Sequence, residues 1–313
     1  MTLDVGVVVV NYNTRDLLRR CLQTVRASVG VRFEVCVVDN ASTDGSAELV
    51  AREFPEVRVI RSPFNGGYAY ANNLGLRAFG FGIPGRTPEP RYALLLNPDT
   101  EVPPDALARM VAFLDAHPEA GAAGPKIVRP DGSLDLACRR SFPTPEVAFY
   151  RFSGLSRLFP RSPRFARYNL TFLDPDQTYE VDAVVGACMM VRREAIMQVG
   201  LLDESFFMYG EDLDWAYRIK QAGWKIYYSP EVVILHVKRA SSRMSPRARY
   251  EFNRAMWIFY RKHYQATTPR WLDLLVRAGL VLKGGWRLWQ EMRQDLRQGK
   301  EARDGQEARP LAS

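Results

Sequence analysis

Amide and carboxylate side chains follow two apolar runs of this sequence, where strands would end. The run Tyr92–Leu96 stops at Asn97 and Asp99, and the run Val35–Val38 stops at Asp39. Such oxygens bind hard divalent cations and accept hydrogen bonds from a ribose or a base. Taken alone, NPDT is more typical of a turn, and in DNASTDGS an Asx turn or helix cap stays open beside the binding role.

An acidic pair opens a later helical segment. Glu211 and Asp212 follow the aromatic stretch SFFMYG, while Asp214 pairs with Arg218 one turn on. Negative charge suits a helix N-terminus, which explains the last pair adequately. The large apolar side chains of this stretch would place one carboxylate against a surface from which water is partly excluded. Burial of that kind raises the pKa of a carboxyl group, which suits a general base.

A histidine ends the strand that follows this helix. His236 is one of three histidines and stands 24 residues after Asp212. A lone histidine at a strand end is more often structural than a ligand. A functional role for it requires a metal ion at Asp99.

The first half of the chain predicts the elements that position these residues. Predicted strands are Val5–Val10, Val35–Val38, Val57–Ile60 and Tyr92–Leu96, and predicted helices are Asp16–Arg26, Ser46–Phe54, Tyr68–Phe79 and Asp105–His117. This alternation predicts an α/β fold with a doubly wound, mostly parallel sheet, whose ligands bind at the carboxyl ends of the strands. The first strand leads into NYNT instead of GxGxxG, which argues against a dinucleotide oxidoreductase.

The second half is less regular. Strand-like pieces in AAGPKIV and VDAVVGACMMV flank a basic, aromatic stretch where we expect long loops and a short helix. A helix at about residues 212–222 and strands at Lys225–Tyr228 and Val232–Leu235 complete a domain of residues 1–240. Residues 241–298 predict a basic, amphipathic helical region, and residues 299–313 a disordered tail.

Charge and cysteine usage restrict the class of protein. The formal charge is +8, and the run Arg139–Arg167 holds seven Arg against Glu146 alone. Such a surface suits anionic lipid, phosphorylated substrates or nucleic acid. The four cysteines stand singly, which is typical of reduced thiols in a cytosolic protein. We expect neither a signal peptide nor a membrane span.

Five segments in order resemble the inverting nucleotide-sugar glycosyltransferases of family 2, which have a GT-A fold. They are VVVVNYNTRDLLRRCLQTV, VVDNASTDGSAELV, NGGYAYANNLGL, LLLNPDTEV and the stretch from GACMMV to VVILHV, and they cover roughly residues 4–240. The branch they resemble contains the bacterial rhamnosyltransferases of cell-wall and O-antigen assembly. Five motifs in one order are far more specific than any one alone.

The resemblance implies roles for the residues that match. Asp212 would be the catalytic base, and Asp99, Asn97 and His236 would hold Mn²⁺ or Mg²⁺. The family's DxD motif begins with Asn97 here, which leaves Asp99 as the one certain carboxylate ligand. The residues expected to bind the substrate are Asn11, Asn13, Asp39, Asn65, Gly66, Asn73 and Glu211.

The resemblance also implies the substrates. We expect a dTDP- or UDP-sugar donor, with dTDP-rhamnose first and a UDP-hexose as the rival, and a glycan or lipid-linked acceptor. A nucleic-acid-binding protein is a remoter alternative, because it does not explain the polar strand ends. The predicted location is the cytoplasm, with peripheral contact to the inner face of the cell membrane.

Helical spacing in the C-terminal region supports a membrane contact or a packed face. The residues that recur at that spacing, among basic residues, are Trp271, Leu274, Leu275, Ala278, Leu282, Trp286 and Trp289. An interfacial amphipathic helix fits this pattern, and so does a stripe packed on the main domain or on another subunit.

Overall fold

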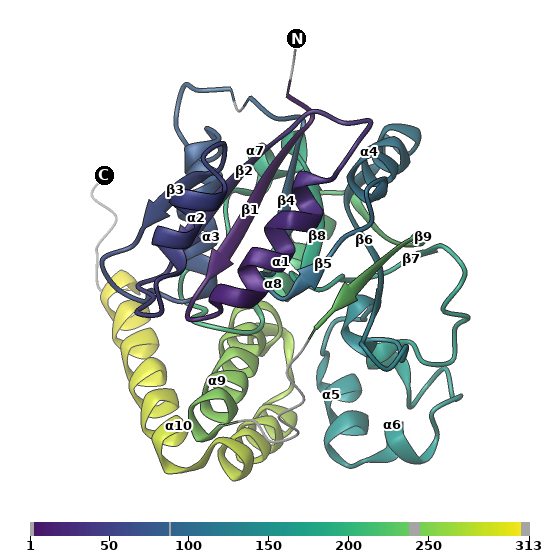
Figure 1. Ribbon diagram of the computed structural model, residues 1–313. Helices are drawn as coiled ribbons and strands as arrows, with labels where there is room; N and C mark the ends of the chain where they lie inside the picture. Colours follow the sequence, from purple (N-terminus) through teal and green to yellow (C-terminus); the bar gives the residue numbers. More distant parts are fainter. Residues whose placement is uncertain (1–2, 88, 238–244, 308–313) are drawn as a thin grey trace. The chain divides into compact units, whose positions relative to one another are not determined.

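The computed structural model describes residues 3–87, 89–237 and 245–307, with side chains through residue 297 (Figure 1). The chain divides into two compact units. The first comprises Met1–Phe207 and Glu211–Ala240, and the second comprises Met208–Gly210 and Ser241–Ser313. All the residues predicted to do chemistry belong to the first unit.

A mixed, mostly parallel sheet forms the centre of the first unit. Its strand order is β3-β2-β1-β4-β8-β6-β9-β5, and β7 pairs with β9. The strands are β1 (Val5–Asn11), β2 (Phe33–Asp39), β3 (Arg58–Arg61), β4 (Tyr92–Leu96), β5 (Thr100–Glu101), β6 (Ala120–Val128), β7 (Tyr179–Glu180), β8 (Cys188–Arg192) and β9 (Lys225–His236). The doubly wound α/β prediction is therefore confirmed for the first half.

One antiparallel strand sits inside this sheet. β8 runs antiparallel to both β4 and β6, and β9 runs parallel to β6. β4, β6 and β9 consequently point the same way as β1 and β2. The carboxyl ends of β1, β2, β4 and β9 thus lie along one edge, and the start of β8 joins them there.

The predicted helices of the first unit are present with their bounds shifted by about one residue, and three shorter helices join them, at residues 145–152, 155–158 and 193–199. They are α1 (Arg15–Arg26), α2 (Ser46–Glu53), α3 (Tyr68–Ala78), α4 (Ala106–Ala116), α5 (Pro145–Phe152), α6 (Leu155–Leu158), α7 (Arg193–Val199) and α8 (Glu211–Gln221). α3 packs closely on β1, since a Cβ at Gly75 would lie 2.4 Å from Val8 Cγ1. A larger residue at that position would push α3 off the sheet.

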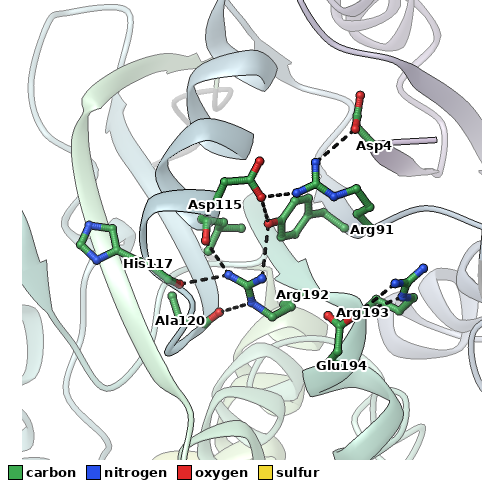
Figure 2. A network of polar contacts seen from close by, with 10 residues as sticks. Asp4, Arg91, Asp115, His117, Ala120, Arg192, Arg193 and Glu194 are labelled. Carbon is green, nitrogen blue, oxygen red and sulfur yellow. Dashed lines mark hydrogen bonds and ion pairs between the residues drawn. The ribbon is translucent and has the colours of Figure 1, made fainter. Parts of the chain in front are cut away.

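A polar network fixes the edge of the sheet opposite the site. Figure 2 shows the Arg192 guanidinium donating to the backbone oxygens of Ala120 and His117, at 2.8 and 3.0 Å. The hydroxyl of Tyr92 donates to Asp115 at 2.6 Å. Because Tyr92 begins β4 and Arg192 ends β8, these contacts clamp the end of α4 to the far edge of the sheet.

Not all arginines of the basic stretch after β6 are exposed to solvent. Arg139 and Arg140 are 2% and 7% exposed, and Arg139 donates to the backbone oxygens of Leu173 and Asp174. Further along, α5 and α6 expose four large apolar side chains, those of Phe149, Phe152, Leu158 and Phe159. Two of the seven arginines in this stretch therefore lie in the interior and do not add to a basic surface.

The second unit is helical. It contains α9 (Pro246–His263) and α10 (Arg270–Glu307), and the chain within α10 turns at Gly285, whose φ of 76° is left-handed. Trp257 and Tyr260 of α9 pack with Leu280, Leu288 and Met292 of α10 as a core. α10 continues to Glu307, into the segment expected to be a disordered tail, and residues 308–313 lie outside the described residues. Among the residues described, no helix is long and apolar enough to cross a membrane.

Candidate active site

The ends of β1 and β2 bring three predicted site residues together. The Asn11 amide donates to Asp39 Oδ1 at 3.2 Å and to Ser42 Oγ at 3.0 Å. Asp39 Oδ2 accepts the Ser42 backbone N–H at 3.1 Å, so the Asx turn that the sequence left open is present. Asn13 has a left-handed φ of 52°, and its side chain accepts the Thr43 N–H at 2.8 Å. Together these contacts hold the loop after β2 against the end of β1.

Asn40 connects this loop to the segment before α3. Its amide nitrogen donates to Asn65 Oδ1 at 2.9 Å and to the Gly67 carbonyl at 3.2 Å, and its oxygen accepts the Gly66 N–H at 3.1 Å. Asn65 and Gly66 are therefore placed next to the end of β2, as predicted. Asn40 follows Asp39 at a polar strand end, but the sequence predicted no role of its own for it.

Asn73 lies in a different environment from the other predicted substrate residues. It is 1% exposed, and its amide donates to the Leu202 carbonyl at 2.9 Å and to Glu204 at 2.8 Å. Its oxygen accepts the Leu202 N–H at 3.1 Å. These three bonds fasten α3 to residues 202–204, so Asn73 holds the structure here and is not grouped with Asn65 and Gly66.

The end of β4 forms the turn that NPDT predicts. The backbone N–H and the hydroxyl of Thr100 both donate to the Asn97 carbonyl, at 3.3 and 2.7 Å. Within the described residues the Asn97 side-chain amide has no hydrogen-bond partner. Asp99 is partly exposed, and its Oδ1 lies 3.0 Å from His236 Nε2. The turn therefore presents the side chains of Asn97 and Asp99, and β9 brings His236 beside Asp99 at the same edge of the sheet.

A second carboxylate, that of Asp135, contacts the other ring nitrogen of His236. His236 is 1% exposed, and its Nδ1 lies 3.2 Å from Asp135 Oδ2, which is itself buried. A carboxylate on one imidazole nitrogen fixes the ring and its tautomer so that the other nitrogen faces a ligand. No pattern in the sequence around Asp135 pointed to this contact, because it joins residues 101 positions apart.

The side chains at Asp99 and His236 suit a divalent cation whose remaining ligands come from a bound substrate. No group of three His, Cys, Asp or Glu side chains gathers as a metal cluster in the part of the chain that the structure describes. Asp99 and His236 supply one carboxylate and one imidazole, which Mn²⁺ accepts. The Asn97 amide is adjacent in sequence, and diphosphate oxygens are the natural source of the remaining ligands.

Asp212 lies at the start of α8 with three donors aimed at it. Its Oδ2 accepts Arg140 Nη2 at 2.6 Å and the Gly186 N–H at 2.9 Å, and its Oδ1 accepts the Leu213 N–H at 2.8 Å. Burial alone would lower the pKa of Arg140, but the Asp212 carboxylate and Tyr168 outweigh it and raise that pKa. The ion pair with Arg140 was not predicted from the sequence.

Glu211, the neighbour of Asp212, has one carboxyl oxygen that is buried without a hydrogen-bond partner in the described part of the chain. It is 6% exposed, and its Oε2 is buried with no hydrogen-bond partner among the described residues. Burial, reinforced by the charge of Asp212, raises the pKa of Glu211 to about 8. One carboxyl group of this pair therefore has a raised pKa, as expected from its apolar surroundings. That group is Glu211 and not the expected base, Asp212.

Tyr68 connects the two halves of the site. Its hydroxyl donates to the Gly186 carbonyl at 2.8 Å, and the Gly186 N–H donates to Asp212. Burial raises the pKa of Tyr68, and the carboxylates of Glu211, Asp212 and Asp99 raise it further. The Asn97 backbone N–H donates to the Ala187 carbonyl at 2.9 Å, so residues 186 and 187 join the turn after β4 to the acidic pair of α8.

Comparison with known proteins agrees with this arrangement. Residues 6–200 match the model of the family described as glycosyl transferase family 2. The chain is 30% identical over 287 residues to the N-acetylglucosaminyl-diphospho-decaprenol L-rhamnosyltransferase of Mycobacterium tuberculosis, covering 90% of this chain and 92% of that protein. It is 25% identical to the low-salt glycan biosynthesis hexosyltransferase Agl10 of Haloferax volcanii, covering 90% of this chain and 83% of that one.

A solved structure shows the same fold. The mannosyltransferase PcManGT of Pyrobaculum calidifontis, in complex with GDP-Man and Mn²⁺, superimposes with a TM-score of 0.56 and 20% identity, covering 92% of this chain and 72% of that one. The mostly parallel sheet is thus that of the GT-A fold. The chain belongs to glycosyl transferase family 2 and is a glycosyltransferase.

Proposed function

We propose that this enzyme transfers L-rhamnose from dTDP-rhamnose, with inversion, to a lipid-linked acceptor in cell-surface polysaccharide assembly. The observation that carries the proposal is the convergence of Asp212 and the Asp99–His236 pair on one sheet edge, at the place where such folds bind their ligands. The donor sugar follows from the relative of Mycobacterium tuberculosis, whose name specifies L-rhamnose and a diphospho-decaprenol acceptor.

Asp212 is the proposed catalytic base. Three N–H donors hold its carboxylate in place, and lone pairs remain on Oδ1 to accept an acceptor hydroxyl. As the acceptor oxygen bonds to the anomeric carbon, its proton passes to Asp212 and the bond from that carbon to the diphosphate breaks. A single displacement of this kind inverts the anomeric centre.

Asp99 and His236 are the proposed ligands of Mn²⁺ or Mg²⁺, with Asn97 beside them. Asp135 orients His236 for this purpose, so the pair needs little rearrangement to receive a cation. When bound, the cation offsets the negative charge that develops on the departing diphosphate. Mn²⁺ suits this set better than Mg²⁺, because an imidazole is one of its members.

Asn11, Asn13, Asp39, Asn65 and Gly66 are the proposed nucleotide-binding residues. They follow β1 and β2 and are tied into one polar loop cluster at the sheet edge. In this arrangement Asp39 is 5% exposed and already accepts two hydrogen bonds. Its proposed role is therefore to fix the geometry of the loop that binds the base or the ribose.

A UDP-hexose donor is the second candidate, and the relative Agl10 is named a hexosyltransferase. The proposed acceptor side is the α5–α6 segment, where Phe149, Phe152, Leu158 and Phe159 are exposed. Arg157 and Arg161 are exposed there too, and a lipid tail with a diphosphate suits such a combination. The proposed location is the cytoplasm at the inner face of the membrane.

The test is a transfer assay with each donor and Mn²⁺. dTDP-rhamnose, UDP-glucose and UDP-N-acetylglucosamine are offered in turn with N-acetylglucosaminyl-diphospho-decaprenol as acceptor. Product from dTDP-rhamnose with inverted anomeric configuration supports the proposal. Transfer from a UDP-sugar alone moves the assignment to the second candidate, and a product of retained configuration overturns the role of Asp212.

A further inference from the structure

α10 has an exposed apolar face that the proposed reaction does not use. Trp271, Leu274, Leu275, Leu282 and Trp286 form this α10 apolar face, and they are 65%, 60%, 61%, 86% and 67% exposed. The first four recur at spacings that place them on one side of a helix. Trp286 follows directly after the turn at Gly285. Four large apolar side chains exposed on one side of a helical segment, with a fifth just beyond the turn, are unusual in water.

The opposite side of α10 already has its packing partner. Leu280, Leu288 and Met292 are buried against Trp257 and Tyr260 of α9. Because this core holds α10 in place, the helix does not depend on the exposed face for its folding. The exposed face is therefore available for something outside the second unit.

The charges of α10 are divided between these two sides. Its three acidic residues with described side chains, Asp273, Glu291 and Asp295, each accept a hydrogen bond from an α9 side chain. The exposed charged residues over the same range are all basic: Arg270, Lys283, Arg287, Arg293 and Arg297. Outward positive charge beside an apolar stripe is the complement of an anionic surface with an apolar interior.

We propose that the α10 apolar face docks onto an anionic lipid bilayer. The helix before Gly285 is about 22 Å long at 1.5 Å per residue, shorter than a bilayer core of about 30 Å, so it lies in the interface. Trp271 and Trp286 stand near the two ends of the face, and indole rings favour the headgroup layer. This docking is independent of which sugar the enzyme transfers.

Vesicle flotation of the full chain tests the proposal. Vesicles of phosphatidylglycerol mixed with phosphatidylcholine are compared with vesicles of phosphatidylcholine alone, at low and high salt. We expect binding to the anionic vesicles that weakens with salt. The double substitution Leu274→Ser and Leu282→Ser lowers the partition coefficient by about tenfold or more for each leucine.

The matched control removes exposed apolar side chains elsewhere. Val29 and Met197 of the first unit are 61% and 59% exposed, and Val29→Ser with Met197→Ser leaves vesicle binding unchanged. Thermal unfolding of both double variants verifies that they fold. The proposal is overturned by native protein that ignores anionic vesicles, or by a Leu variant that binds them as well. It is also overturned if the Leu substitutions instead split a dimer in sedimentation velocity, because the face then joins two copies.

Discussion

The buried carboxyl group of Glu211 makes the stability of this enzyme depend on pH in an unusual direction. Burial and the neighbouring charge of Asp212 raise the pKa of Glu211 from 4.5 to about 8. Between these values the folded chain retains a proton that the unfolded chain has lost. The folded state is therefore fully stabilised at low pH, and that contribution is lost as pH rises from the unfolded pKa toward about 8.

The substitution Glu211→Gln removes this titration while keeping the size of the side chain. With 1.36 kcal/mol per pKa unit, a shift from 4.5 to about 8 lowers the free energy of unfolding by roughly 2 to 3 kcal/mol between pH 5 and pH 7. The native protein loses this much relative to Glu211→Gln across the same interval. Urea unfolding at pH 5, 6, 7 and 8, followed by circular dichroism, measures the difference.

Glu231 provides the control, because it is an exposed glutamate of β9. Glu231→Gln leaves the pH dependence of the unfolding free energy as it is in the native protein. Parallel pH profiles for the native protein and Glu211→Gln would refute the reasoning, since Glu211 would then ionise in the folded state as readily as it does in water.

Further predictions concern the base, its ion pair and the metal ligands. Asp212→Asn leaves the dissociation constant of the donor near its native value but lowers kcat by about 10² or more, as steady-state transfer kinetics will show; weak donor binding with substantial residual transfer contradicts its role as base. Arg140→Met leaves the buried Asp212 unpaired and destabilises the fold by about 3 kcal/mol in urea unfolding, whereas a loss within the error of the measurement refutes the buried pair. Asp135→Asn weakens the hold on His236 and raises the Mn²⁺ concentration for half-maximal transfer by about tenfold or more; an unchanged Mn²⁺ titration argues against the metal role of His236.

Local patterns in the sequence predict the parallel half of the fold well. Tyr92–Leu96 is a strand with the predicted bounds, and the predicted helix Asp16–Arg26 begins one residue earlier, at Arg15. Continuous β-branched runs and one-sided apolar periodicity depend on near neighbours in the chain, so a window of a dozen residues contains them. The same window shows which polar residues follow each parallel strand.

Contacts between distant segments lie outside such a window. Arg140 lies in a run that looks like a basic surface, and only the fold reveals that Asp212, 72 positions away, draws it into the interior. The pairing of Asp135 with His236 is equally remote in sequence. The antiparallel insertion of β8 also depends on the whole sheet, because its apolar run alone is compatible with either strand direction.

The central claim is that Asp99 and His236 hold a cation against the diphosphate of a sugar nucleotide. The most direct test is thermal stabilisation by dTDP, UDP or GDP, each with Mn²⁺ or with EDTA. It is measured in the native protein, in Asp99→Ala, and in Asp131→Ala as a control on an exposed turn. We predict a shift with one nucleotide that requires Mn²⁺, persists in the control and disappears in Asp99→Ala. No shift with any nucleotide, or the same shift in Asp99→Ala, would contradict it.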